Sequence, residues 1–211
     1  MSPPRTVGLL GGSFNPPHVA HQLLALYVLE TQQIDELWLA PTFQHALGKP
    51  LLAYDHRVAM CELACTALGP RARVSRCEHE LAHQPGFVAS RTLDLIEYLA
   101  QTHPGVRFRL VIGADILGET AKWHRWDDVV AKAPPIVVGR AGYPLPAGAT
   151  AAGLALPAVS STEIRTLLGQ LAANERAQFA AGGTLDPALE AVGALLPAQV
   201  LRYIATHGLY R

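Results

Sequence analysis

A glycine-rich stretch near the amino terminus, residues 8–21 (Gly-Leu-Leu-Gly-Gly-Ser-Phe-Asn-Pro-Pro-His-Val-Ala-His), constrains the fold more than any other part of the chain. The apolar run over residues 6–10 predicts a buried strand, and the glycines end it. Asn15 and the two prolines after it predict the start of a helix that carries residues 22–30. The stretch therefore predicts a strand, a tight loop and a helix N-terminus in direct succession.

This loop is suited to binding a phosphate group. Glycines let backbone N–H groups approach an anion, and the dipole of the following helix adds partial positive charge at the same point. His18 and His21 lie three residues apart near the helix start and would add two more donors. The Walker and dinucleotide-binding fingerprints do not fit, because Gly48 and Lys49 are followed by proline and no G-x-G-x-x-G occurs. From these residues alone, the alternative is an ordinary strand–helix turn with two surface histidines.

The composition restricts the partners and the compartment. The 211 residues, half of them hydrophobic, are enough for one large domain with a sizeable core. Lysine plus arginine equals aspartate plus glutamate at 17 each, so no overall basic field favours nucleic acid. Because the sequence has no apolar signal region or membrane-spanning run, we expect a cytoplasmic protein with no membrane partner. Cys61, Cys65 and Cys77 are expected to be core thiols and not metal ligands, since a structural zinc site needs four ligands.

Strands and helices alternate along the chain. Further strands are predicted at residues 36–42, 71–75, 107–112, 135–138 and 154–156, and helices at residues 54–67, 87–101 and 127–132, with a surface loop at residues 142–153. Strand–helix–strand units of this length form parallel pairs with right-handed crossovers. We therefore expect an α/β fold, a Rossmann-like doubly wound parallel sheet over residues 1–165, and a small C-terminal helical part over residues 166–211 with breaks at Gly182-Gly183 and Pro197.

Two later segments add candidate ligand-binding residues at strand ends. Residues 43–53 are a predicted loop with His45 and Lys49, and its position after a parallel strand places it beside the phosphate loop. Gly113 and Asp115 follow the strand at residues 107–112, where an acidic side chain is well placed to accept ribose hydroxyls.

A second motif, Ser160-Ser161-Thr162-Glu163-Ile164-Arg165, marks the start of a late helix. Ser160 and Glu163 have the spacing of a capping box, which is a purely structural reason for the segment. A Gly-rich turn ending in H-x-G-H and a later S-S-T-x-I-R are also the two signatures of the nucleotidyltransferase superfamily. The chain resembles that superfamily at both motifs, with Ala20 in the place of the glycine.

Within the superfamily, the chain resembles the bacterial nicotinate-nucleotide adenylyltransferases along nearly its full length. The supporting segments are residues 56–60 (His-Arg-Val-Ala-Met), 90–94 (Ser-Arg-Thr-Leu-Asp), 112–115 (Ile-Gly-Ala-Asp), Trp123, 138–140 (Val-Gly-Arg) and the tail 197–210. Pantetheine-phosphate adenylyltransferases share the two signatures but not this tail. The resemblance implies transfer of AMP from ATP to nicotinate mononucleotide, which gives deamido-NAD and pyrophosphate.

The resemblance also implies roles for individual residues. Because the acceptor's own phosphate is the nucleophile, positioning and charge neutralisation are what the protein must supply. The expected catalytic residues are His18, His21, Lys49 and Arg165. ATP is expected to contact Gly11, Gly12, Ser13, Phe14, Gly113, Asp115, Ser161, Thr162 and Arg165. The acceptor is expected to contact Asn15, Arg91, Thr92 and Trp123, with the Trp123 ring stacked on the nicotinate and the Thr92 N–H on its carboxylate. Mg²⁺ is expected to be bound through the ATP phosphates, without a protein metal site.

Three departures from the family pattern keep alternatives open. They are Ala20, the separation of His45 from Lys49, and Arg91 in place of a tyrosine. A cation at position 91 would favour the acid over the amide of the pyridine, and the alternative is a solvated surface arginine. The rival functions are the same transfer to nicotinamide mononucleotide or phosphopantetheine, and a nucleotide-sensing module without turnover. Apolar positions in the helical tail would serve either a homo-oligomer or packing on the sheet.

Overall fold

A parallel sheet forms the centre of the molecule. The computed structural model describes residues 4–44, 48, 50–145, 151–171 and 187–211. The strands are β1 (Thr6–Gly12), β2 (Glu36–Pro41), β3 (Ala72–Val74), β4 (Arg107–Gly113), β5 (Ile136–Arg140) and β6 (Ala151–Leu156). All neighbouring pairs are parallel, in the order β3-β2-β1-β4-β5-β6. The chain therefore winds outward from β1 in both directions, which confirms the doubly wound α/β fold and puts the switch point between β1 and β4.

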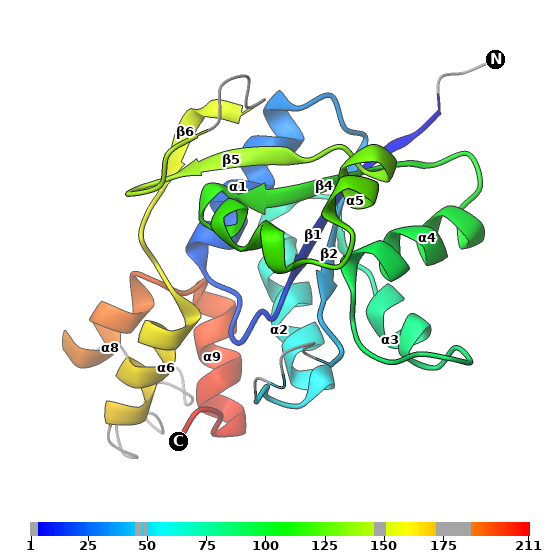
Figure 1. The fold of residues 1–211 in the computed structure, drawn as a ribbon. Coiled ribbons are helices and arrows are strands. Elements are labelled where there is room, and N and C mark those ends of the chain that lie inside the picture. The colour runs from blue at the N-terminus through cyan, green and yellow to red at the C-terminus, as the bar shows by residue number, and fades with distance from the viewer. Residues whose placement is uncertain (1–3, 45–47, 49, 146–150, 172–186) are drawn as a thin grey trace.

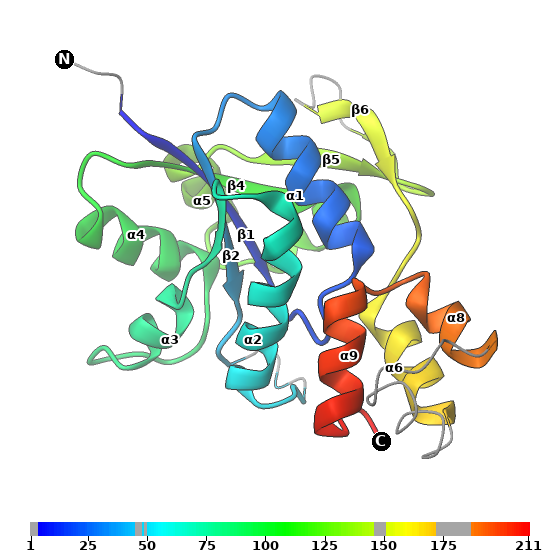
Figure 2. The same cartoon turned by 180° about the vertical axis from the view of Figure 1, so that it is seen from behind.

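Helices cover both faces of the sheet, as Figures 1 and 2 show from opposite sides. One face carries α1 (Val19–Thr31) and α2 (Tyr54–Cys65), and the other carries α3 (Cys77–Ala82), α4 (Thr92–Thr102) and α5 (Trp126–Lys132). The remaining helical segments are the 3₁₀ turns η1 (Thr66–Leu68) and η2 (Ala114–Lys122) and the helices α6 (Ser161–Gln170), α8 (Pro187–Gly193) and α9 (Ala198–His207).

Alternation along the strands divides the core between the two faces. Successive side chains of a strand point to opposite faces, so Val7 and Leu9 of β1 pack with α4 while Leu10 packs with α1. Almost every residue of β1 and β2 is apolar because both strands are covered on both sides.

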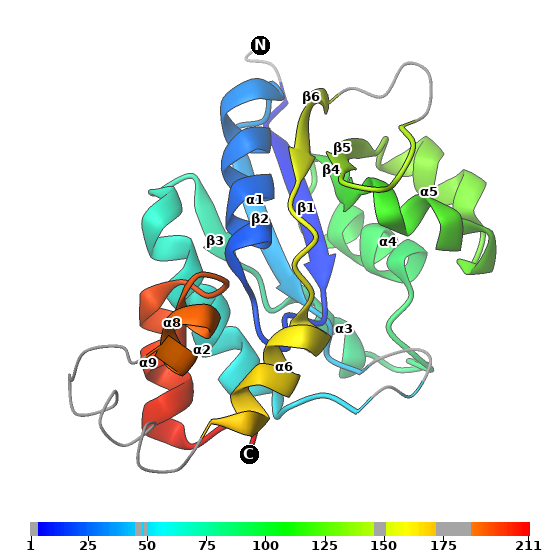
Figure 3. The ribbon, with the colours of Figure 1, turned by 90° about the vertical axis from the view of Figure 1, so that its left-hand side faces the viewer.

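The C-terminal helices form a third cluster beside this sandwich. Ile164 of α6 and Ile204 of α9 pack against Met60 of α2 and Ala20 of α1. Figure 3 shows α6 following β6 directly and lying with α8 and α9 next to the lower ends of α1 and α2. The division expected between residues 165 and 166 falls inside α6. The predicted break at Pro197 is confirmed as the start of α9, and Gly182-Gly183 lies outside the described residues.

The element boundaries correct the sequence prediction in three places. The helix predicted from residue 87 begins at Thr92, because Arg91 has an extended backbone. Neither α3 nor η2 was predicted, since α3 has only six residues and η2 is a 3₁₀ segment that lacks the 3.6-residue period of an α-helix. β6 begins at Ala151, inside the predicted loop 142–153, where pairing with β5 overrides the weak strand preference of alanine and glycine. Within the described ranges, no helix combines the length and the apolar character that a bilayer-spanning segment needs.

Candidate functional site

A cavity of about 510 Å³ opens at the carboxyl ends of β1 and β4, at the switch point of the sheet. Ligands of open parallel sheets bind at this place, because the two loops leaving the sheet there diverge. The predicted site residues that line the cavity are Gly11, Gly12, Ser13, His18, His21, Arg91, Thr92, Gly113, Asp115 and Trp123. The structure thus gathers the phosphate loop and the starts of α1, α4 and η2 around one space.

Side chains from other elements hold the phosphate loop, residues 13–18, by donating hydrogen bonds to its carbonyl oxygens. The Ser13 carbonyl oxygen accepts a hydrogen bond from Nη1 of Arg57 at 2.9 Å. The Asn15 oxygen accepts from Nη1 of Arg165 at 2.8 Å, and the Pro16 oxygen accepts from Oγ of Ser161 at 2.9 Å. The two sequence motifs therefore touch, although they lie far apart along the chain.

The two histidines of the loop pack ring against ring, with centroids 3.8 Å apart. The backbone N–H of His18 donates to the ring nitrogen Nδ1 of His21 at 3.1 Å. The neutral His21 ring therefore carries its proton on Nε2. Burial, aided by the charge of Arg140, lowers the pKa of His18 to about 4. Burial, then His18 and Arg140, lowers the pKa of His21 well below its usual value. Both rings are consequently neutral hydrogen-bond donors at neutral pH.

An ion pair closes the far side of the cavity. Nη1 of Arg140 lies 2.7 Å from Oδ2 of Asp115, and Nη2 of Arg140 donates to the Val159 oxygen at 2.9 Å. This arginine therefore links the end of β5, the start of η2 and the segment before α6. A Cβ at Gly113 would collide with the Asp115 carboxylate, so a larger residue there would displace this carboxylate from its position beside Arg140. Arg140 has no role in the sequence prediction beyond its place in the family resemblance. Its partner Asp115 comes from another strand end, so no local pattern around Val-Gly-Arg indicates the ion pair.

The opposite wall carries the residues expected to meet the acceptor. Arg91 and Thr92 are the N-cap and first residue of α4, so backbone N–H groups without helical partners lie beside the Arg91 side chain. Trp123 directly follows η2 and packs edge-on against Trp126, with ring centroids 5.4 Å apart. The wall therefore combines donors for an anion with an aromatic surface.

Glu78 is a cavity residue that sequence reasoning missed. It is 6% exposed, and one of its carboxylate oxygens, Oε2, has no partner among the described residues. Burial raises the pKa of this carboxyl group, while hydrogen bonds from Ser90 and from the Phe43 backbone oppose the increase. No signal could have found it, because α3 itself was not predicted.

Several predicted residues lie next to the cavity and not in its wall. The Phe14 side chain is buried in the core, and Asn15 is 4% exposed with its side-chain oxygen accepting from Oη of Tyr210 at 2.8 Å. Arg165 also donates through Nη2 to Oγ1 of Thr162 at 3.1 Å. Ser161 completes this group, which contacts the loop through its carbonyl oxygens. His45 and Lys49 lie outside the described residues.

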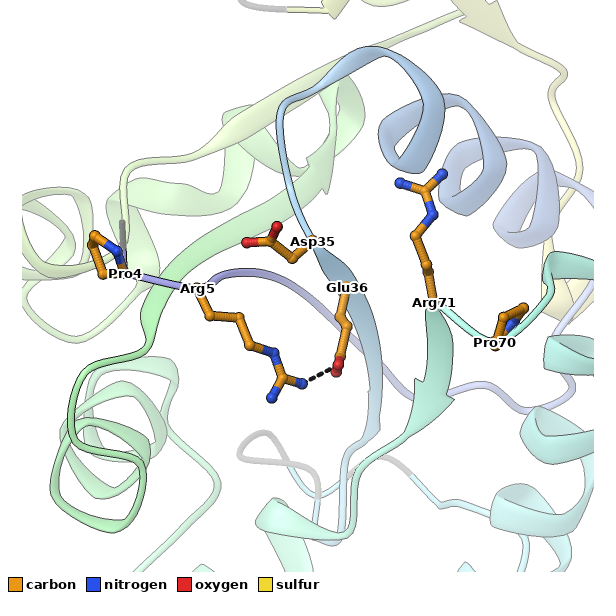
Figure 4. Close-up of a pocket in the computed structure, with 6 residues that line it drawn as sticks. All are labelled: Pro4, Arg5, Asp35, Glu36, Pro70 and Arg71. Atoms are coloured by element: carbon orange, nitrogen blue, oxygen red, sulfur yellow. Dashed lines mark ion pairs between the residues drawn. The ribbon is translucent and has the colours of Figure 1, made fainter. Parts of the chain in front are cut away.

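A second cavity, of about 530 Å³, lies at the opposite end of the strands, by the amino ends of β1, β2 and β3 (Figure 4), and is lined by Pro4, Arg5, Asp35, Glu36, Pro70 and Arg71. Its charged groups are all engaged within the chain. Arg5 pairs with Glu36, Arg71 pairs with Glu30, and Asp35 accepts from the Thr6 N–H at 2.7 Å. It therefore offers a ligand no charge without a partner, and the switch-point cavity is the candidate site.

The side chains of the described residues offer no cluster for a metal ion. Nowhere in the described ranges do three or more His, Cys, Asp or Glu residues gather in a suitable arrangement. Cys61, Cys65 and Cys77 are free and buried, as expected of core thiols, and burial raises the pKa of each.

Comparisons with known proteins point to the same family as the two sequence motifs. A family model described as cytidylyltransferase-like matches residues 9–167. A protein of Anaeromyxobacter sp. (strain K), named "Probable nicotinate-nucleotide adenylyltransferase", is 48% identical over 211 residues, with 100% of both chains covered. A protein of the same name from Myxococcus xanthus (strain DK1622) is 40% identical over 210 residues, covering 100% of this chain and 97% of its own. The solved Plasmodium falciparum nicotinic acid mononucleotide adenylyltransferase complexed with NaAD has a TM-score of 0.74 at 17% identity, with 98% and 97% of the two chains covered, which shows a shared fold.

Proposed function

The chain belongs to the cytidylyltransferase-like family and to its nicotinate-nucleotide adenylyltransferases, and on that premise we propose that it transfers AMP from ATP to nicotinate mononucleotide. The products are deamido-NAD and pyrophosphate, so the reaction is a step of NAD biosynthesis. The observation that carries the proposal is the direct contact between the two signature motifs, next to the switch-point cavity that the first motif lines. One triphosphate beside the loop would then meet groups from both ends of the chain.

The chemistry requires little more than positioning. An oxygen of the acceptor phosphate attacks the α-phosphorus of ATP, the bond from that phosphorus to the bridging oxygen breaks, and pyrophosphate leaves with the electron pair. The attacking oxygen is already anionic, so no protein base takes a proton. What lowers the barrier is donors aimed at the α-phosphate as charge develops there, in a site that excludes water.

His21 is the central donor in this proposal. Its Nε2–H is available because Nδ1 is occupied by the His18 N–H. His18 and the backbone N–H groups of residues 11–13, which line the cavity, would contact the same phosphate. Ser161, Thr162 and Arg165, with the helix dipole of α6, would attract the β- and γ-phosphates while holding the loop. Lys49 is proposed on the resemblance alone.

The acceptor would occupy the wall formed by α4 and η2. The nicotinate carboxylate would meet the Thr92 N–H and the Arg91 guanidinium, and its ring would stack on Trp123. Gly113 and Asp115 would face a ribose. Asn15, whose side chain is bonded to Tyr210, would act on the acceptor through the loop that it shapes.

The proposal also includes Mg²⁺ bound through the ATP phosphates, a location in the cytoplasm and assembly as a homo-oligomer. Phosphate oxygens with water are ligands that suit Mg²⁺ and, among the described residues, no side-chain cluster competes with them. We place the protein in the cytoplasm because ATP is its substrate. Leu23 and Leu26 on the outer face of α1 are 43% and 45% exposed, which is compatible with a second copy packing there.

Pyrophosphate release tests the function. The protein is incubated with ATP, Mg²⁺ and one acceptor at a time: nicotinate mononucleotide, nicotinamide mononucleotide or phosphopantetheine. We expect the highest kcat/KM with nicotinate mononucleotide and deamido-NAD as its product. A higher kcat/KM with nicotinamide mononucleotide or phosphopantetheine would make that compound the acceptor. ATP binding without pyrophosphate release in the presence of any acceptor would indicate a nucleotide sensor.

A further inference from the structure

Arg57 is the most deeply buried charged side chain near the phosphate loop. It lies on α2, is 1% exposed, and does not line the cavity. Its Nε donates to the Leu52 oxygen at 2.8 Å and its Nη1 donates to the Ser13 oxygen at 2.9 Å. Burying a guanidinium is costly unless its charge is compensated. Among the described residues no carboxylate lies within ion-pair distance of it. Glu78 interacts with it electrostatically from further away, and the Tyr54 ring lies 5.4 Å from the guanidinium carbon. Its hydrogen bonds go to two backbone oxygens, one of which belongs to the phosphate loop.

The contact fixes the direction of one peptide group. The Ser13–Phe14 bond is trans, so its carbonyl and its N–H point in opposite directions. Arg57 binds the carbonyl, and the Phe14 N–H therefore points away from α2. Among the described residues this N–H has no acceptor, although Phe14 is only 1% exposed. A buried N–H without a partner is rare in folded proteins. Phe14 does not line the cavity, so the bond from Arg57 keeps this peptide in an orientation in which its own N–H gains no hydrogen bond.

Phe14 also needs support to keep its backbone conformation. Its φ of 45° lies in the left-handed region, which is unfavourable for a bulky residue. The carbonyl before it is held by Arg57, and the carbonyl of the next residue, Asn15, is held by Arg165. Two cations thus hold the loop on both sides of the strained residue, which is how such a conformation persists at a binding site.

We propose that Arg57 is a positioning residue of the phosphate loop: it holds the Ser13–Phe14 peptide, and with it the cavity-lining Ser13, in place for the nucleotide phosphates, and it puts a positive charge behind the loop. The inference rests on the proposed function only in taking ATP as the ligand. It assigns Arg57 to the nucleotide and not to the acceptor, whose residues lie on α4 and η2. Its loss should therefore weaken nucleotide binding selectively.

The test is the affinity of the full-length protein for α,β-methylene-ATP, measured by calorimetry together with KM for nicotinate mononucleotide. Arg57→Gln removes the charge, and we expect affinity to fall on the order of tenfold, as for loss of a charge-assisted hydrogen bond. KM for the mononucleotide should change less than about threefold. Arg57→Lys keeps the charge but cannot bond both carbonyl groups, and should lie between wild type and Arg57→Gln.

Two variants control for trivial effects. Arg71→Gln removes another arginine bonded to a backbone carbonyl, that of Leu29 at 3.0 Å, and should leave nucleotide affinity unchanged. Val58→Ala opens a cavity at a fully buried neighbour on α2, so it should lower stability but not affinity. Wild-type affinity in Arg57→Gln, or an equal rise in KM for the mononucleotide, would overturn the proposal. If Arg57→Gln does not fold, Arg57→Lys decides, and wild-type affinity in it has the same meaning. Wild-type protein that binds the analogue but releases no pyrophosphate would contradict the proposed function and leave the role of Arg57 to be decided by these affinities.

Discussion

His21 is held by its neighbour in the orientation that a phosphate donor needs. Nδ1 accepts the His18 N–H, and burial keeps the ring neutral, so Nε2–H remains to face a ligand. We expect His21→Ala to lower kcat about a hundredfold, since a donor to developing charge is typically worth that much. Steady-state pyrophosphate release measures it, with His83→Ala, an exposed histidine outside the cavity, as the control. Retention of kcat within about threefold of wild type would remove His21 from the mechanism.

The neutral state of His18 makes stability depend on pH. Its pKa is about 4 in the folded protein and near 6.5 when unfolded, so between these values the unfolded state binds a proton that the native state does not. The free energy of unfolding should therefore be fully retained above pH 6.5 and fall as the pH drops to 4, by about 3 kcal/mol from this residue. Urea unfolding of wild type and His18→Asn between pH 7 and 4 isolates the contribution. An equal fall of the free energy of unfolding in wild type and His18→Asn would contradict this prediction.

Arg91 is expected to select the acid form of the acceptor. Its side chain lines the cavity beside the N-terminus of α4, where a carboxylate gains charge-assisted hydrogen bonds that an amide does not. In Arg91→Tyr the ratio of kcat/KM for nicotinate mononucleotide over nicotinamide mononucleotide should fall about tenfold. An unchanged ratio would make Arg91 an ordinary surface residue.

Residues with local signatures could be predicted, and residues defined by distant contacts could not. The glycines of the loop and both histidines were recognisable because their chemistry follows from spacing alone, and the structure places them in the cavity wall. Arg57 and Glu78 were not assigned, since their partners come from other elements. Ala20 stands where the family has glycine, and its methyl group packs into the C-terminal cluster.

At the scale of elements, two adjacent serines at the start of α6 have different roles: one stabilises the helix and the other contacts the phosphate loop. Ser160 caps the helix by accepting the Glu163 N–H at 3.1 Å, as the capping box predicted, whereas Ser161 bonds the Pro16 oxygen of the loop. Ser160→Ala should lower the free energy of unfolding by about 1 kcal/mol and leave KM for ATP within about twofold. Ser161→Ala should raise KM for ATP several-fold. Urea unfolding and steady-state kinetics measure both, and identical effects of the two substitutions would mean that α6 contributes only stability.

The sequence predicted long elements better than short ones. β1, α1 and β4 have strong apolar patterns and appear close to their expected bounds. α3 and η2 depend on tertiary packing, which no local pattern encodes, and the start of α4 was missed because the preceding turn carries apolar residues too. The elements of the acceptor wall were consequently hard to predict, although Arg91, Thr92 and Trp123 themselves were expected from the family resemblance and line the cavity.

For the whole molecule, the central feature is that both ends of the chain meet at one loop. Arg165 and Tyr210 both contact Asn15, and the third hydrophobic cluster packs α6 and α9 onto α1 and α2. Figure 3 shows these C-terminal helices close to the start of α1. The doubly wound topology could be predicted from the alternation of strands and helices, but the placement of the last helices could not, because several sites on such a sheet can accept them.

The most direct test follows oxygen through the reaction. The protein is given ATP and nicotinate mononucleotide labelled with ¹⁸O in its phosphate, and the products are analysed by mass spectrometry. If the acceptor's phosphate attacks the α-phosphorus, all of the label stays in deamido-NAD and the pyrophosphate is unlabelled. Label in the pyrophosphate, or AMP formed without deamido-NAD, would contradict the account.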